Sequence, residues 1–189
     1  MQFIIDKSIF DHFVGMKIVV ATVKGLGATP QSQAIDEQLN RGWQIAREAA
    51  TAYGNPQSHP FVKAWGETMR RVGVSRKKFP SSIEALVRRA GKSEFPFKIN
   101  PLVDFYNGIS MDNLVPAGGF DLDALNHNLE LRFSREGDTF LALDSDAALA
   151  LPEGEVCYAD GNEIITRHFV WKQSKHAILK PESENIVLV

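Results

Sequence analysis

Residues 101–123 read PLVDFYNGISMDNLVPAGGFDLD, and the character of the chain changes within this stretch. Its first part predicts a helix from Pro101 to Met111, because a proline start is followed by apolar residues on one side, namely Leu102, Phe105, Tyr106 and Ile109. Beyond Pro116, short alternating segments are separated by tight turns, a pattern typical of strands. The stretch therefore separates a helical part of the chain from a strand-rich part.

Helices are predicted for most of the chain before residue 101. Apolar residues recur near a period of 3.6 over residues 35–49 and again over residues 61–69. Ser81 with an acid at Glu84 is a capping signal, so a helix is expected from about Ser82 to Ala90. Only the start of the chain differs, where β-branched residues at 3–5 and 17–23 predict strands.

The predicted strands of the second part lie at residues 129–133, 139–143, 156–159, 166–174 and 185–189. Helices grouped before strands favour an α+β fold over an alternating α/β fold. With 189 residues, 44 % of them hydrophobic and 23 % charged, the composition fits a single domain over 1–189. The lone Cys157 cannot form an internal disulfide and is expected in the core. No apolar run long enough for a membrane helix and no signal-peptide pattern is present, so we expect a cytoplasmic protein that binds no membrane.

Charge is unevenly distributed along the chain. The net charge is −2, which argues against coating nucleic acid by bulk electrostatics. From Arg70 to Lys98, however, nine basic residues stand against Glu84 and Glu94, a local charge of +7. Such a segment suits a polyanion that touches one face of the protein. A solvated helix face is the alternative explanation.

Common catalytic signatures are missing from the sequence. The five histidines are scattered without the spacing of a zinc site, so neither a metal nor a cofactor is expected. Gly25 and Gly27 lack the third glycine of a dinucleotide-binding loop and are interpreted as a turn. There is also no phosphate-binding loop and no Gly-x-Ser-x-Gly motif. No side-chain nucleophile is therefore indicated.

Two stretches are richer in polar groups than a scaffold needs. In residues 116–123, paired glycines beside acids would let a ligand approach the backbone closely, although a tight turn explains them equally well. In residues 166–174, strand alternation would place Arg167, Phe169, Trp171 and Gln173 on one face. Polar side chains on such a face need partners, and a pocket would supply them.

The order of several motifs resembles the B-three/B-four editing domain of the bacterial phenylalanyl-tRNA synthetase beta chain. The likeness covers roughly residues 70–189 and rests on Asn100-Pro101-Leu102-Val103-Asp104, Asn107, Gly119-Phe120-Asp121-Leu122-Asp123, Arg132, Gly137-Asp138-Thr139 and Tyr158-Ala159-Asp160. The resemblance implies a three-layer β/β/α arrangement. In the synthetase this domain hydrolyses tyrosine wrongly attached to the tRNA for phenylalanine.

The departures from the family bear on the substrate. Gly118 stands where the family usually has a histidine, and the bulkier residues 169–175 replace a glycine-rich strand whose glutamate recognises the tyrosine hydroxyl. Phe169 and Trp171 in place of glycines should shrink the pocket and favour a small amino acid. The resemblance thus implies a deacylase that edits mischarged tRNA in trans, without the modules needed for aminoacylation.

Deacylation without a nucleophile requires positioned water and hydrogen-bond donors for the developing oxyanion. The expected catalytic groups are the amides of Gly118 and Gly119 with Asn100, Asn107 and Gln173, and the expected substrate-binding wall is Arg167, His168, Phe169 and Trp171. The expected phosphate-binding residues are Arg76, Lys77, Lys78, Arg88, Arg89 and Lys92. The expected partner is mischarged tRNA rather than DNA. A non-catalytic tRNA- or RNA-binding module and a small-metabolite-binding protein remain alternatives, and a cover over the pocket by residues 1–60 is left open.

Overall fold

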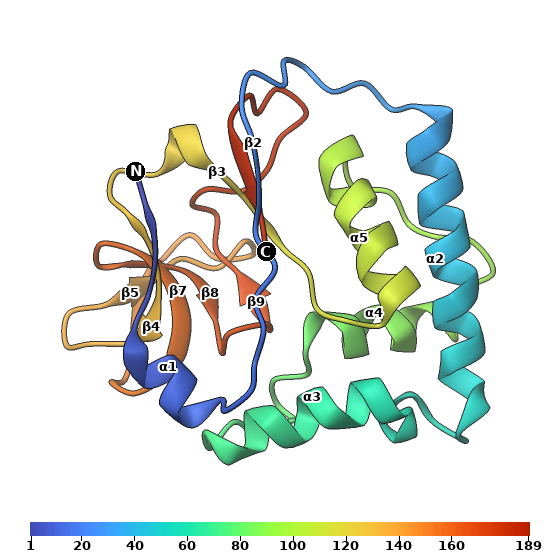
Figure 1. Ribbon diagram of the computed structural model, residues 1–189, viewed down its shortest axis with the longest axis horizontal. Helices are drawn as coiled ribbons and strands as arrows, with labels where there is room; N and C mark the ends of the chain where they lie inside the picture. The colour runs from blue at the N-terminus through green and yellow to red at the C-terminus, as the bar shows by residue number, and fades with distance from the viewer.

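Two β-sheets and a group of helices form three layers in the computed structural model, which describes all 189 residues. Figure 1 shows the small sheet standing between the large sheet and the helices. This arrangement confirms the α+β class and the β/β/α order expected from the resemblance.

The helices begin where the sequence offers a cap. Ser81 accepts a hydrogen bond from the Glu84 N–H at the start of α4 (Ser82–Ala90), as predicted. Asn100 caps α5 (Pro101–Asn113), which ends two residues later than expected. The remaining helices are α1 (Lys7–His12), α2 (Gln33–Ala52) and α3 (Pro60–Arg71), with short 3-10 turns at Pro56–Ser58 and Leu122–Ala124.

Two glycines allow α2 and α5 to pack tightly. A Cβ at Gly42 would lie 2.5 Å from the carbonyl oxygen of Gly108, closer than real Cβ atoms come. The apolar side of α2, including Leu39 and Trp43, is buried with α4 residues in one core cluster. The helical layer is therefore held together by its own core.

The large sheet has the order β1-β4-β7-β8-β5-β6, and β9 pairs with β8. Its strands are β1 (Phe3–Ile5), β4 (Leu129–Phe133), β5 (Thr139–Phe140), β6 (Leu149–Ala150), β7 (Val156–Asp160), β8 (Glu163–Arg167) and β9 (Lys172–Gln173). β1 joins β4 in parallel, so the first residues of the chain extend a sheet made by the last third.

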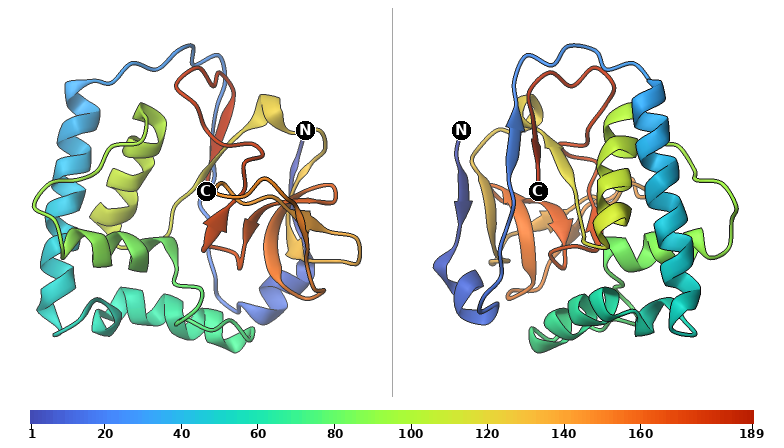
Figure 2. Two further views of the ribbon diagram at one scale, coloured as in Figure 1. Left: turned by 180° about the vertical axis from the view of Figure 1, so that it is seen from behind. Right: turned by 45° about the vertical axis from the view of Figure 1, so that its right-hand side comes forward.

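The small sheet has the order β2-β10-β3, formed by Ala21–Val23, Ile186–Leu188 and Gly119–Asp121. The strand predicted over residues 17–23 is thus wrong for its first four residues, which pair with no strand. In both views of Figure 2, this part of the chain runs from α1 past the large sheet to β2. Lys17, Ile18 and Val19 of this segment instead line a pocket.

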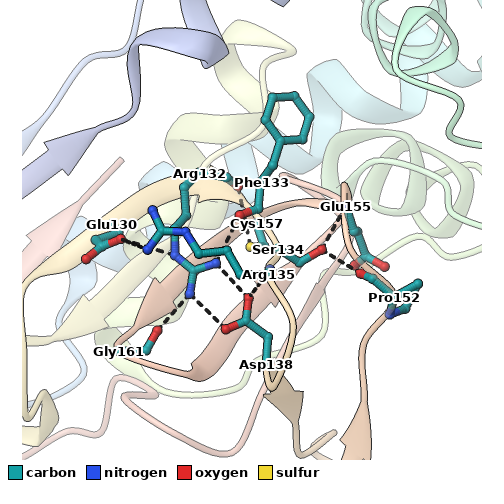
Figure 3. A network of polar contacts seen from close by, with 10 residues as sticks. All are labelled: Glu130, Arg132, Phe133, Ser134, Arg135, Asp138, Pro152, Glu155, Cys157 and Gly161. Carbon is teal, nitrogen blue, oxygen red and sulfur yellow. Dashed lines mark hydrogen bonds and ion pairs between the residues drawn. The ribbon is translucent and has the colours of Figure 1, made fainter.

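Arg132 and Asp138 form a buried ion pair within the large sheet (Figure 3). Arg132 donates to the two carboxylate oxygens at 2.6 and 3.0 Å and to the Gly161 carbonyl at 2.7 Å. The pair joins the turn after β4 to the turn after β7, so these two motif residues support the sheet. Cys157 is buried beside them, as predicted, and burial raises its thiol pKa to about 12. No helix of the protein has both the length and the apolar character that crossing a membrane requires.

Candidate functional site

A pocket of about 350 Å³ lies where the two sheets meet α5 and α3. Thirteen of its 21 lining residues are hydrophobic, which is typical of a small-molecule site. Phe169, Trp171 and Tyr158 come from the large sheet and its hairpin, Phe120 from β3, and Trp65 from α3. The predicted substrate-binding roles of Phe169 and Trp171 are therefore compatible with their positions.

Apart from Lys17 and Lys172, the polar side chains that line the pocket are neutral. Tyr106 and Asn107 on α5 line it, as do Tyr158, Thr166 and Gln173 of the large sheet. Burial raises the pKa of Tyr106 to about 12 and also raises that of Tyr158, so both phenols stay protonated at neutral pH. Among the lining residues there is no carboxylate, histidine or cysteine side chain.

Several of these groups have no hydrogen-bond partner within the protein. None of the side-chain hydrogen bonds involves the hydroxyls of Tyr106, Tyr158 or Thr166, nor the amide of Asn107. Neither tyrosine hydroxyl oxygen is completely buried, so both remain accessible from the pocket. Unpartnered donors on an apolar wall are the groups that orient a ligand.

Residues 166–174 form a tight hairpin, so the predicted continuous strand is wrong. His168 and Phe169 have φ values of +46° and +61°, and the chain reverses between β8 and β9. Cross-strand partners share a face, and the partners are Thr166 with Gln173 and Arg167 with Lys172. Arg167 and Gln173 consequently lie on opposite faces, and only Gln173 lines the pocket.

Arg167 and His168 belong to a separate cluster around Glu155. Arg167 donates to the two Glu155 oxygens at 2.8 and 2.7 Å, and the His168 N–H donates to the same carboxylate at 3.1 Å. The His168 ring is buried against Phe79, with centroids 3.9 Å apart, and desolvation lowers its pKa. Their expected position in the substrate wall is corrected, because neither residue lines the pocket.

The five expected catalytic residues are divided by the structure. Gly118, Asn107 and Gln173 line the pocket, whereas Gly119 and Asn100 do not. The Gly118 N–H already donates to the Val189 carbonyl at 2.9 Å, so it is not free for an oxyanion. Gln173 Nε2 donates to the Gly119 carbonyl at 3.0 Å, which leaves its amide oxygen available.

Asn100 has a structural position. Its side chain accepts the Val103 N–H at 3.0 Å and donates to the Leu179 carbonyl at 3.0 Å. It thus caps α5 and ties this helix to the chain before β10. Both the oxygen and the nitrogen of the Asn100 amide thus have partners within the protein, and no ligand is needed to satisfy them.

The expected phosphate-binding residues also separate into two groups. Arg76 and Arg88 both pair with the buried carboxylate of Glu84, and Arg76 in addition donates to the Gln57 carbonyl at 3.0 Å. Arg89 lies over the ring of Phe97, 5.1 Å from its centroid, and remains exposed. Exposed side chains without an ion-pair partner remain at Lys77, Lys78 and Lys92.

One group of side chains has the composition of a metal site. Ligand atoms of Asp160, Glu163 and His176 lie within 4.8 Å of one another; Asp160 and Glu163 flank the turn between β7 and β8, and only His176 comes from a separate segment. Burial acts to raise the pKa of Asp160, but N–H groups of Asn126 and His127 and the His176 ring outweigh it and lower the pKa. Because these bonds already occupy both carboxylate oxygens, we interpret the group as support for the sheet.

Sequence reasoning missed the wall provided by the start of the chain. Met16, Lys17, Ile18 and Val19 line the pocket, which answers how residues before 60 contribute. Lys17 is the lining cation without an ion pair, since Lys172 is held by Asp144 at 2.8 Å. The only signal in the sequence was the apolar run within residues 17–23, which predicts a strand.

Comparison with known proteins places this geometry in a family. The model of the B3/4 domain family matches residues 64–189, which include all of the pocket wall except Met16–Val19. A search of curated proteins found no match. Among solved structures, one match is an N-terminal fragment of the phenylalanyl-tRNA synthetase beta-subunit from Pyrococcus horikoshii, with 9 % identity and a TM-score of 0.46. The match covers 99 % of this chain and 42 % of that fragment, so the chain spans less than half of its length.

Proposed function

Since the chain belongs to the B3/4 domain family, we propose that it is a deacylase acting in trans on mischarged tRNA. The reaction is hydrolysis of the ester that joins a wrongly attached, small amino acid to the terminal ribose. The proposal is supported by the sequence resemblance to the synthetase editing domain over residues 70–189.

The observation that carries this proposal is a pocket with unpartnered neutral donors and with no histidine or carboxylate side chain that could activate a hydroxyl as a nucleophile. Tyr106, Asn107, Tyr158 and Thr166 offer unpartnered groups to a largely apolar cavity. An ester carbonyl develops negative charge when water attacks it, and donors already fixed in a poorly hydrated site stabilise that charge effectively. Without such a base, the hydroxyls of Ser82 and Thr166 in the pocket are weak nucleophiles.

Water is the nucleophile in the proposed reaction. Its oxygen attacks the ester carbonyl carbon, and the bond between this carbon and the ribose oxygen breaks. The water supplies one oxygen of the released carboxylate; one of its protons goes to the ribose hydroxyl and the other is released to solvent. Asn107 and the free amide oxygen of Gln173 would orient water and the amino group, while the phenol of Tyr106 would donate to the oxyanion.

Pocket size supports a small aminoacyl group. At about 350 Å³ the cavity lies at the low end of ligand pockets, which span roughly 300–1,000 Å³. The ring of Phe169 packs with those of Trp65 and Tyr158 at centroid distances of 6.0 and 5.9 Å, which closes one side. A terminal ribose with a bulky amino acid would compete with these rings for space.

We propose that the exposed cations without an ion-pair partner bind the phosphates of the tRNA backbone. Lys77, Lys78, Lys92 and Arg89 have no carboxylate partner, unlike Arg76 and Arg88. Replacing Lys77 and Lys78 by glutamine should therefore weaken tRNA binding at low salt and reduce the log–log salt slope by about one unit for each phosphate that is no longer neutralised. Equal affinity and slope for parent and variant would remove these lysines from the interface.

A single-turnover assay over a panel of mischarged tRNAs tests the proposal directly. We expect release of a small amino acid, and Tyr106→Phe should slow it without changing tRNA affinity. Release from no member of the panel, with tRNA binding retained, would favour a non-catalytic tRNA- or RNA-binding module. Absence of both, with a small metabolite protecting the protein against unfolding, would favour a metabolite-binding protein.

A further inference from the structure

A second groove of about 330 Å³ adjoins the pocket. It is bounded by the segment after α1 and by one side of α3, and it shares Met16, Lys17, Trp65 and Val115 with the pocket. The two cavities therefore lie next to each other, with these four residues as common wall.

The groove combines exposed cations with an exposed aromatic ring. Lys17 and Arg71 line it and form no ion pair, and no carboxylate side chain is among the lining residues. Phe61 is 58 % exposed, which is high for a ring of this size. On α3, residues 61, 65, 68 and 71 follow at three or four positions and so share one face.

We propose that this groove holds the unpaired 3′ nucleotides of the tRNA, with a base stacked on Phe61 and phosphates paired with Lys17 and Arg71. Sites for single-stranded nucleic acid combine a positively charged track with aromatic faces on which bases stack. A groove of this volume is too small for a folded duplex, so the proposed occupant is single-stranded. This inference rests on the proposed deacylase function, because it supplies the path by which the ester reaches the pocket.

The groove differs from the basic segment around α4 in how much of its positive charge is free to bind a phosphate. There Arg76 and Arg88 are committed to Glu84, so their charge is largely neutralised. Along α3 the carboxylate of Glu67 is paired with Lys63 at 3.8 Å, and neither residue lines the groove. Of the two free cations of the groove, Lys17 also lines the pocket.

The test compares intact tRNA with the same tRNA trimmed of its unpaired 3′ nucleotides. The parent should bind the intact form about tenfold more tightly, as expected for one stacked base and its phosphates. Phe61→Ala and Arg71→Gln should each reduce this preference severalfold, and Arg71→Gln should also lower the salt slope by about 0.7, the value for one single-strand phosphate contact. The matched control is Lys63→Gln on α3, which should keep both preference and slope. Circular dichroism should show all three variants folded, because the replaced side chains are exposed.

The outcomes distinguish this inference from the function on which it rests. If the parent deacylates tRNA and prefers the intact form, while Phe61→Ala and Arg71→Gln keep that preference, the groove assignment is wrong and the deacylase proposal stands. If the parent shows no preference for the intact form, the 3′ end does not occupy the groove. If the parent neither deacylates nor binds tRNA, both proposals fail.

Discussion

Arg76 lies against Glu84, with Nε 2.6 Å from Oε2, and the Glu84 side chain is only 1 % exposed. The guanidinium also packs so closely on α3 that a Cβ at Gly66 would lie 2.6 Å from it. A residue that the charge pattern suggested for phosphate binding therefore joins α3, α4 and the loop between them.

Replacing Arg76 by glutamine should lower the free energy of unfolding. The Glu84 carboxylate would keep only one of its two cationic partners while staying buried, and such a change costs about 2–4 kcal/mol. Urea unfolding measures the change, and Lys77→Gln is the matched control, expected within about 0.5 kcal/mol of the parent. Equal stability of the two variants would contradict the structural role of Arg76.

Substitutions at the two neighbouring glycines should affect the stability of the fold to different degrees. A Cβ at Gly119 would lie 2.6 and 2.8 Å from side-chain atoms of Leu179 and Leu188, whereas one at Gly118 would meet nothing within 4 Å. Gly119→Val should thus destabilise the fold by about 1–3 kcal/mol or more. Gly118→Ala should keep the stability, and thermal unfolding of both variants decides the matter.

Thr166 and Gln173 face each other across the hairpin and both line the pocket. Thr166→Val removes a hydroxyl at nearly constant shape, and Gln173→Ala removes an amide, so each should reduce the single-turnover rate by about tenfold, or 1.4 kcal/mol. Affinity for uncharged tRNA should stay unchanged, because phosphate contacts are made elsewhere. An equal reduction of rate and affinity would contradict a role limited to the reacting end.

Gln173→Ala also removes the hydrogen bond to the Gly119 carbonyl. A decrease of about 1 kcal/mol in stability is expected from this alone. Thr166 makes no such bond, so a slow Thr166→Val variant with parental stability would isolate the effect on the reaction.

Trp171 sets the width of the pocket. Its ring packs on Phe79 with centroids 4.6 Å apart and lines the cavity. Trp171→Ala should enlarge the space for the aminoacyl group, so the variant should release bulkier amino acids that the parent leaves attached. Rates over the panel of mischarged tRNAs measure this change, and an unaltered order of substrates would place the specificity elsewhere.

Stability should decrease as the pH falls below about 6.5, the ordinary pKa of histidine. Desolvation lowers the pKa of His168 in the folded protein, so the unfolded chain binds a proton first as the pH drops. Glu155 opposes this shift, and Arg167 adds to it. The lowered pKa of His59 acts in the same direction.

His168→Asn should flatten this dependence, because asparagine tolerates the positive φ and does not titrate. Unfolding free energies between pH 7 and pH 5 provide the measurement. A variant as sensitive to pH as the parent would show that His168 does not control it.

Local signals predicted the elements that have their own caps and periodicity. Ser81 caps α4 as expected, and Pro101 begins α5. The hairpin at residues 168–169 carries no comparable signal, because a histidine and a phenylalanine adopt positive φ there without glycine or asparagine. Strand propensity through the same residues favoured a continuous strand, and this misplaced Arg167 relative to Gln173.

The sequence by itself determined the α+β class, most of the helices, and the motif order typical of the family. These features depend on residues close together in the chain, where periodicity and turn chemistry act directly. Only the tertiary structure decided that Met16–Val19 wall the pocket, that Glu84 holds Arg76 and that Asn100 caps a helix. Pocket walls and ion-pair partners arise from the packing of distant segments, and side-chain type alone does not show whether a charge is buried with a partner or free in solvent.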